Sequence, residues 1–220
     1  MFLVQNRQDA AVNPGVMAHA AVAGRWSDLW RRLGARSIPD PAPILAKWGA
    51  PHRHYHGLAH LRHCLAVYDR NPLRADRVEL ALWFHDAVYD AQARDNEARS
   101  AAWAAELAFA VGLQAAIIDA VNACILATRH RHEPASTAEA LTVDADLAIL
   151  GETRVRFARY DAAIRAEYAW VAAEDYRIGR ARVLRGFLER SRIFTTTWFH
   201  RRYERRARRN LAWALRRLSA

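Results

Sequence analysis

The adjacent residues His85 and Asp86 end an apolar segment that begins at Leu80, and both side chains can bind protons and metal ions. A buried carboxylate without a partner loses the hydration that stabilises its charge. Burial of this pair therefore requires either an internal hydrogen-bond network or a metal ion. A His-Asp dipeptide alone is weak evidence for a site, so other parts of the chain must supply further ligands.

Three histidines lie upstream of this pair, at His56, His60 and His63. Positions three or four apart share one face of a helix. This face continues through the apolar residues Cys64 and Val67, so His60 is predicted to point toward the interior. The alternative interpretation is a cluster of surface histidines.

Two aspartates, Asp144 and Asp146, lie downstream in an otherwise apolar helical run. Residues two positions apart differ by about 200° around a helix, so the two side chains cannot both face one site. One aspartate is predicted to be a ligand and the other to cap the helix or support the ligand. The alternative is a helix cap followed by a solvated residue.

Four motifs together resemble the HD superfamily of metal-dependent phosphohydrolases, and more narrowly its predicted HD-type phosphohydrolases. They are Arg-x-Tyr-His, Phe-His-Asp-x-x-Tyr, Asp-Asn-Glu-x-x-Ser and Asp-Ala-Asp-Leu-Ala-x-Leu-Gly, at residues 53–56, 84–89, 95–100 and 144–151. The resemblance extends from about Trp26 to the C-terminus. It implies an all-α HD-type helical domain and metal-dependent hydrolysis of a phosphate ester, with a small nucleotide-type molecule as the expected substrate.

The resemblance also implies a set of metal ligands, namely His60, His85, Asp86 and Asp146. Asp146 is chosen over Asp144 because it follows Ala and precedes an apolar residue, as the family's aspartate does. Two imidazoles and two carboxylates suit Mn, Fe, Co or Zn better than Ca, with Mg as an alternative. Asp86 is also expected to lie near the attacking water. Asp144 is then expected to support the helix or a ligand.

One divalent ion is expected rather than two. Two-metal members of the superfamily carry further histidines, and the first such position corresponds to Asn96 here. Asparagine is a poor ligand for a transition metal. The second region contains His130, which could approach the site or lie in a surface loop.

Several polar residues are candidates for substrate binding and catalysis. Arg53, His56, Arg129 and His130 could bind a phosphate, because arginine presents a planar fork and histidine a donor. Arg53 and Arg129 could equally be surface residues. Glu97 could orient or deprotonate the water, with helix capping as the alternative.

The resemblance also bears on the choice between His56 and His60, because HD proteins usually place the ligand histidine four residues before a small apolar residue on a buried helix face. His60 precedes Cys64 by four residues on the apolar face, whereas His56 lies beside Gly57 near the helix start. We therefore expect His60 to bind the metal and His56 to reach across the mouth of the pocket. Tyr89 and Asp90 are expected to close the pocket wall.

The elements that position these residues are predicted to be helical throughout. Helical spacing of apolar residues predicts about nine helices. The first begins at Trp26, a short one precedes Pro51, and the others span roughly 57–70, 76–87, 95–111, 115–129, 137–150, 154–170, 174–190 and 198–218. No segment alternates with the period of a strand. Residues 1–22 lack a clear period and are expected to form a poorly ordered N-terminal extension to a single domain at 23–220.

Composition agrees with one domain that has a substantial core, because 52% of the 220 residues are hydrophobic. Charges interrupt every apolar run, so no membrane span is expected. Polar residues begin at Gln5, so no signal peptide is expected either. We expect a cytoplasmic protein with Cys64 and Cys124 as reduced core thiols. The sequence leaves the oligomeric state open, with a homodimer as one alternative.

The net charge of +10 comes largely from the C-terminus, where eight arginines and one glutamate lie between His200 and Ala220. A stripe through Tyr203, Ala207 and Leu211 predicts a helix that packs on the domain with its arginines outward. We expect a solvated basic face rather than a nucleic-acid site.

Two functional hypotheses follow from these residues. The first is a metal-dependent phosphohydrolase acting on a small phosphoester substrate. The alternative is a non-catalytic HD fold that binds a nucleotide or a metal as a sensor or scaffold.

Overall fold

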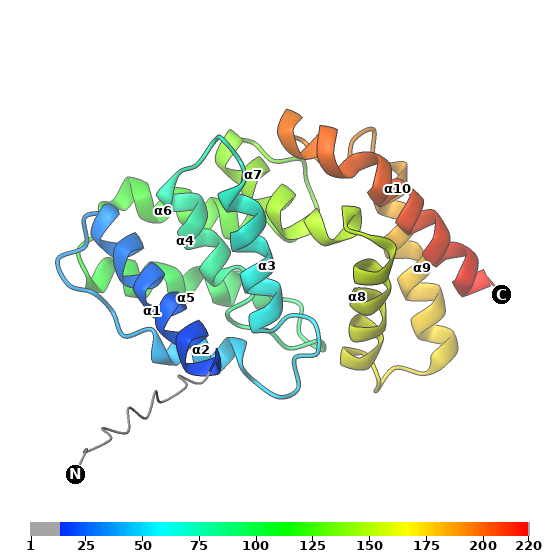
Figure 1. Ribbon diagram of the computed structural model, residues 1–220, viewed down its shortest axis with the longest axis horizontal. Helices are drawn as coiled ribbons and strands as arrows, with labels where there is room; N and C mark the ends of the chain where they lie inside the picture. The colour runs from blue at the N-terminus through cyan, green and yellow to red at the C-terminus, as the bar shows by residue number, and fades with distance from the viewer. Residues whose placement is uncertain (1–13, 220) are drawn as a thin grey trace, which may run out of the picture.

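The chain folds into helices because its apolar residues recur every three or four positions, which places them on one face of each helix. The computed structural model describes residues 14–219, and their side chains from residue 22 onward. Over these residues it contains ten α-helices, one short 3₁₀-helix and no β-strand (Figure 1). The all-α fold class is confirmed, and each predicted helical segment corresponds to one of the ten α-helices.

The helices lie within three residues of the predicted bounds from the third helix onward. They are α1 (Pro14–Arg32), α2 (Ala42–Trp48), α3 (Leu58–Asp69), α4 (Asp76–Phe84), α5 (Asn96–Ala110), α6 (Ala115–Ala127), α7 (Thr137–Leu147), the 3₁₀-helix η1 (Ala148–Gly151), α8 (Arg154–Glu167), α9 (Ala173–Glu189) and α10 (Thr197–Ser219).

The first helix differs most from the prediction. Helix α1 begins at Pro14, so residues 14–22 form its first turns rather than part of an extension. Proline suits the first turn of a helix because its missing N–H would have no helical partner there. Residues 1–13 of the predicted extension lie outside the described residues.

Helix α4 ends earlier than predicted, and this matters for the site. Its last residue is Phe84, and His85 and Asp86 follow in a turn that the bond from Ala87 N to Phe84 O closes at 2.9 Å. Neighbours within a regular helix would point about 100° apart. His85 keeps helical φ and ψ of −51° and −37°, yet its Nε2 and Oδ2 of Asp86 converge to 3.1 Å.

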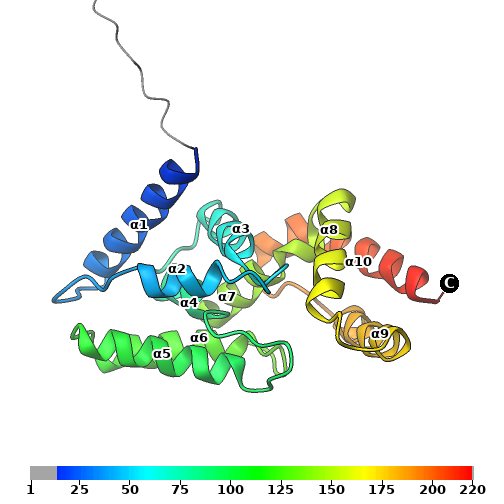
Figure 2. The same cartoon turned by 90° about the horizontal axis from the view of Figure 1, so that it is seen from below.

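The helices are arranged in two groups along the longest axis of the molecule. Figure 1 shows α1 to α7 together on one side and α8, α9 and most of α10 on the other, and Figure 2 shows the same division from below. Helix α10 packs along η1 and α9, and α8 also contacts η1. The short η1 segment therefore connects the two groups.

Four tryptophans form the part of the core that lies behind the site. Trp26, Trp30, Trp48 and Trp83 are all fully buried. The ring of Trp26 meets those of Trp30 and Trp83 edge to face at 5.2 and 5.1 Å between centroids. The indole N–H of Trp48 donates to the carbonyl oxygen of Trp83 at 2.9 Å. This bond ties α2 to the end of α4, next to His85.

Helix α10 packs as its sequence predicts. Its apolar stripe is buried, with Ala207 and Leu211 fully enclosed. Two of its arginines are used internally, since Arg206 donates to Gly151 O at 2.8 Å and Arg208 donates to Glu204 at 2.7 Å. The basic face is therefore smaller than the arginine count suggests.

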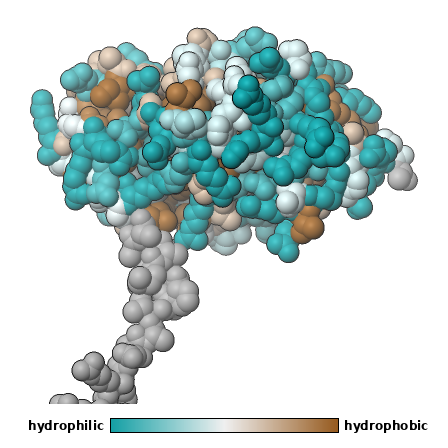
Figure 3. Space-filling view, turned by 45° about the horizontal axis from the view of Figure 1, so that its top comes forward, coloured by the Kyte–Doolittle hydropathy of each residue, from teal (hydrophilic) through white to brown (hydrophobic). Residues whose placement is uncertain are grey.

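The outer surface shown in Figure 3 is mainly hydrophilic, with apolar side chains scattered over it. Scattered apolar residues are normal on a protein surface. Among the described helices, none combines the length and the apolar character that crossing a membrane requires.

Candidate metal centre

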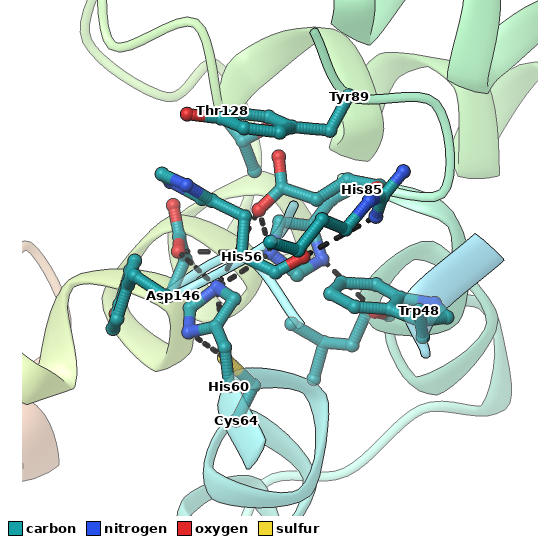
Figure 4. A network of polar contacts seen from close by, with 12 residues as sticks. Trp48, His56, His60, Cys64, His85, Tyr89, Thr128 and Asp146 are labelled. Carbon is teal, nitrogen blue, oxygen red and sulfur yellow. Dashed lines mark hydrogen bonds and ion pairs between the residues drawn. The ribbon is translucent and has the colours of Figure 1, made fainter. Parts of the chain in front are cut away.

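Four side chains from three separate segments converge at one point. His60 comes from α3, His85 and Asp86 follow α4, and Asp146 lies near the end of α7 (Figure 4). His60 Nε2 lies 3.0 Å from His85 Nε2, 3.2 Å from Asp146 Oδ1 and 3.5 Å from Asp86 Oδ2. His85 Nε2 lies 3.1 Å from Asp86 Oδ2 and 3.6 Å from Asp146 Oδ1. The structure thus brings together the four residues predicted as ligands.

This arrangement fits a single ion. Nitrogen and oxygen ligands bind a divalent transition metal at about 2.0–2.2 Å, which places the ligands of a tetrahedral site roughly 3.4 Å apart. The five distances between donors fall on both sides of that value. Both histidines are buried, whereas Asp86 and Asp146 retain 14% and 15% of their side-chain surface and line a cavity. An ion held here would therefore be reachable from the cavity.

Cys64 also belongs to this cluster, which the sequence did not predict. Donor atoms of His60, Cys64, His85 and Asp146 all lie within 4.8 Å of one another and could hold a metal ion. However, Cys64 Sγ lies 3.6 Å from Nδ1 and 3.7 Å from Nε2 of His60. Nearly equal distances to both nitrogens place the sulfur over the imidazole ring, outside the plane of the Nε2 lone pair. Asp86 is therefore the better fourth ligand, and Cys64 packs on His60.

The surrounding chain fixes the orientation of His85. Its Nδ1 lies 2.9 Å from the carbonyl oxygen of Leu82 and can only donate to it. When Nδ1 holds the only ring proton, the lone pair of Nε2 faces His60, Asp86 and Asp146. Histidine metal ligands generally have this arrangement. The ring of Trp48 packs against the imidazole at 5.6 Å between centroids.

The electrostatics of the cluster favour a cation. Burial opposes the ionised forms of Asp86 and Asp146, yet the neighbouring histidines hold the pKa of both carboxyl groups well below its usual range. Burial likewise opposes the charged imidazole of His85, but the two carboxylates raise its pKa well above the ordinary value. Either protons or a metal ion can offset the negative charge of the two carboxylates, so protons and metal compete for the site.

His130 contacts Asp146, one of the predicted ligands, rather than lying in a remote surface loop. Its Nε2 lies 3.0 Å from Oδ2 of Asp146, the carboxylate oxygen that does not face His60. Its backbone has φ of 57°, in the left-handed region that only a few non-glycine residues adopt. Arg190 holds this conformation by donating to the His130 carbonyl oxygen at 2.7 Å. Strained backbone of this kind occurs preferentially at functional sites.

Arg53 has a different place from the one predicted. Its guanidinium donates to the carbonyl oxygens of Asp86 at 2.7 Å and Ala87 at 2.9 Å, and more weakly to that of His56 at 3.2 Å. The residue is only 9% exposed and does not line the cavity. These contacts do not fit the prediction that Arg53 binds substrate. Its role is to hold the His85-Asp86 turn against the segment before α3.

A cavity of about 760 Å³ opens over Asp86 and Asp146. It brings together most of the other predicted site residues, since its lining includes His56, Glu97, Arg129, His130, Tyr89 and Asp90. Arg129 Nε lies 3.8 Å from Glu97 Oε2, so this pair faces the same space. Asn96 also lines the cavity, but its amide exchanges hydrogen bonds with the backbone of Asp90 at 3.1 and 2.8 Å.

Asp144 lies away from the cluster, as the choice of Asp146 implies. Its carboxylate accepts the backbone N–H groups of Thr195 at 2.9 Å and Thr196 at 2.8 Å, and the hydroxyl of Thr196 at 2.6 Å. Burial raises the pKa of Asp144 to about 6 despite these three donors. Asp144 therefore anchors the segment that leads into α10.

Glu167, at the end of α8, is a functional candidate that sequence reasoning missed. Its buried carboxylate accepts hydrogen bonds from residues of two distant segments, at Tyr55, His56 and Tyr89. The sequence offers no signal for this role, because a glutamate at the end of an amphipathic helix is ordinarily solvated.

Comparison with known proteins adds no relatives: no family model, curated protein or solved structure matches this chain. The assignment of the centre therefore depends on its own geometry.

Proposed function

We propose that this chain is a metal-dependent phosphohydrolase of the HD type that acts on a small phosphate ester. One observation carries the proposal. Two imidazole nitrogens lie 3.0 Å from each other and 3.1–3.6 Å from two carboxylate oxygens, in three segments of the chain and at the floor of a large cavity. A buried cluster of this composition has few structural uses, since hydrophobic residues would pack there at lower cost.

The donor set favours particular ions. Mixed histidine and carboxylate ligands suit Mn, Fe, Co or Zn better than Ca, and Mg is an alternative. When bound, such an ion acts as a Lewis acid that lowers the pKa of water and offsets charge on a phosphate. The open faces of Asp86 and Asp146 toward the cavity leave room for both water and substrate.

Three side chains near the proposed metal centre supply the other functions that the reaction requires. Glu97 faces the cavity from the first turn of α5, where its carboxylate can orient a water molecule or accept its proton. Arg129 faces the same space and can bind phosphate oxygens through its planar fork. His130 holds Asp146 from the side opposite His60.

The cavity wall formed by α8 and α9 supports a substrate with an organic part of nucleotide type. A volume of about 760 Å³ is far larger than one phosphate group and lies within the range of small-molecule sites. This wall is mainly aromatic and apolar, with Tyr160, Ile164, Tyr168, Tyr176, Val183 and Phe187. A planar group such as a nucleobase can stack on side chains of this kind.

The experiment is a screen of the purified protein against phosphate monoesters and diesters, with Mn, Co, Zn or Mg added separately. Turnover should require metal and should fall by at least about 10³-fold in Asp86→Ala, since both a ligand and a group near the water are lost. Asp119→Ala, an exposed carboxylate on α6, is the matched control and should retain full activity.

Full activity in a folded Asp86→Ala protein would contradict the mechanism. Metal and nucleotide binding without turnover under any condition would favour the sensor hypothesis instead.

A further inference from the structure

Four hydrogen-bond donors surround the buried carboxylate of Glu167 beside the cavity. Its Oε1 accepts the backbone N–H groups of Tyr55 at 2.7 Å and His56 at 2.9 Å. Its Oε2 lies 2.6 Å from His56 Nδ1 and accepts the hydroxyl of Tyr89 at 2.9 Å. The side chain is only 1% exposed. Glu167 therefore fixes both the backbone and the side chain of His56.

These contacts give the His56 imidazole one orientation. Nδ1 is used by Glu167, and the ring stacks on that of Tyr89 at 4.2 Å with 25° between the planes. The other nitrogen, Nε2, lies on the far side of the ring from Glu167. His56 lines the cavity, and its ring centroid lies 5.9 Å from that of His60. Because Asp86 and Asp146 line the same cavity, a phosphate ester bound over the cluster would lie beside the His56 imidazole.

The charge of Glu167 supports the same arrangement. Burial opposes its ionised form, but its hydrogen bonds, above all with His56, lower the pKa of the carboxyl group to about 2. A charged carboxylate beside Nδ1 requires a proton at that nitrogen. Carboxylates that orient a histidine in this way occur in many enzymes in which the histidine transfers protons.

We propose that His56 donates a proton to the leaving-group oxygen and that Glu167 is the positioning residue that holds His56 for this step. The inference rests on the proposed phosphohydrolase function. Water forms a new oxygen–phosphorus bond while the bond from phosphorus to the ester oxygen breaks. The ester oxygen takes the proton from His56 Nε2, and the attacking water gives one proton to Glu97. One water and one ester thus yield an alcohol and a phosphate, and solvent in the cavity returns His56 and Glu97 to their starting states.

The proposal makes a prediction that a purely structural role for His56 does not. Protonation of the leaving group matters for an alkoxide, which is a poor leaving group, and matters little for p-nitrophenolate. The experiment measures kcat with Mn or Co on p-nitrophenyl phosphate and on an alkyl phosphate such as a nucleoside 5′-monophosphate. The measured quantity is the ratio of the two rates in each variant.

We expect His56→Ala to lower the rate on the alkyl ester by about 10²–10⁴-fold, the usual contribution of a general acid. Its rate on the nitrophenyl ester should fall by less than about tenfold, so that the ratio changes. Glu167→Gln, of the same shape, should change the ratio in the same direction by a smaller factor. His54→Ala, an exposed histidine two positions from His56 that does not line the cavity, is the control and should leave the ratio unchanged.

Metal content and circular dichroism establish that each variant is folded and loaded. An equal loss on both esters in His56→Ala and Glu167→Gln would overturn the proposal while leaving the proposed function intact. Absence of turnover on either ester by the unmodified, metal-loaded protein would overturn the proposed function itself.

Discussion

The Nε2 atoms of His60 and His85 lie 3.0 Å apart, although 25 positions separate the two residues in the chain. The Nδ1 atom of His85 is already bonded to the carbonyl oxygen of Leu82, so Nε2 is the nitrogen that carries the lone pair when His85 gives up its second proton. Two carboxylate oxygens complete the group around these nitrogens. A shared cation, as we propose, would account for this convergence, because all four atoms can offer electron pairs to the same small space.

The two histidines upstream of the doublet are expected to differ in their effect on metal binding. His60→Ala should abolish stoichiometric binding because His60 lies within 3.5 Å of the other three donors. His56→Ala should retain the ion, since His56 is bonded to Glu167 instead. Elemental analysis of both variants measures this difference, with the exposed His54→Ala as the control. Loss of metal in His56→Ala and not in His60→Ala would reverse the assignment.

The two aspartates of α7 are expected to have different roles, with Asp144 contributing to stability and Asp146 to metal binding. Asp144→Ala leaves three donors of Thr195 and Thr196 without their acceptor, at a cost of roughly 1–3 kcal/mol for each that stays buried. Its melting temperature should fall while its metal content stays unchanged. Asp146→Ala should lose the ion. A folded Asp144→Ala protein without metal would contradict this division of roles.

Gly151 is predicted to tolerate no side chain, because an added Cβ would lie 2.6 Å from Tyr203 Cβ and 2.7 Å from Tyr203 O. Gly151→Ala should destabilise the protein by about 1–3 kcal/mol or more, since backbone of α10 must move. Gly179→Ala is the matched control, because its Cβ would meet no atom within 4 Å and alanine favours the helix. Thermal unfolding of both variants gives the comparison. Equal melting temperatures would show that the junction between η1 and α10 is looser than these distances imply.

Glu167 should make the protein sensitive to acid. Its pKa is about 2 in the folded protein, below the ordinary value of 4.5. The stabilisation that it provides is therefore complete above about pH 4.5 and lost as the pH falls toward 2. The contribution to the unfolding free energy amounts to roughly 1.4 kcal/mol for each pH unit in this window.

Urea unfolding at a series of pH values between 2 and 6 measures this slope. Glu167→Gln should be less stable than the unmodified protein at pH 6 and should lose less stability as the pH falls. Identical slopes for the two proteins would mean that Glu167 is not charged in the folded state.

Much of the fold was predictable because helical periodicity is a local signal. The predicted helix at 57–70 and the observed α3 differ by one residue at each end. The start of α1 was missed because residues 14–22 have no clear apolar period, and Asn13-Pro14-Gly15 indicates a turn. Proline at the first turn of a helix gives the same local signal as proline in a loop.

His60, His85 and Asp86 could be singled out because their residue types are costly to bury, so apolar context marks them, whereas the choice of Asp146 over Asp144 came from the family resemblance. Contacts with backbone groups could not be predicted in this way, because they do not depend on residue type. Arg53 binds the carbonyl oxygens of Asp86 and Ala87, and every residue type has a carbonyl oxygen. Glu167 is 111 positions from His56, and only the three-dimensional fold brings them together.

The central claim is that the His60, His85, Asp86 and Asp146 cluster binds one divalent metal ion. The most direct test is elemental analysis after reconstitution with Mn, Fe, Co and Zn in turn and removal of unbound metal. We predict about one ion per chain in the unmodified protein, and none in His85→Ala, which loses one of the four proposed ligands. No stoichiometric ion in the unmodified protein, or the same content in His85→Ala, would contradict the account.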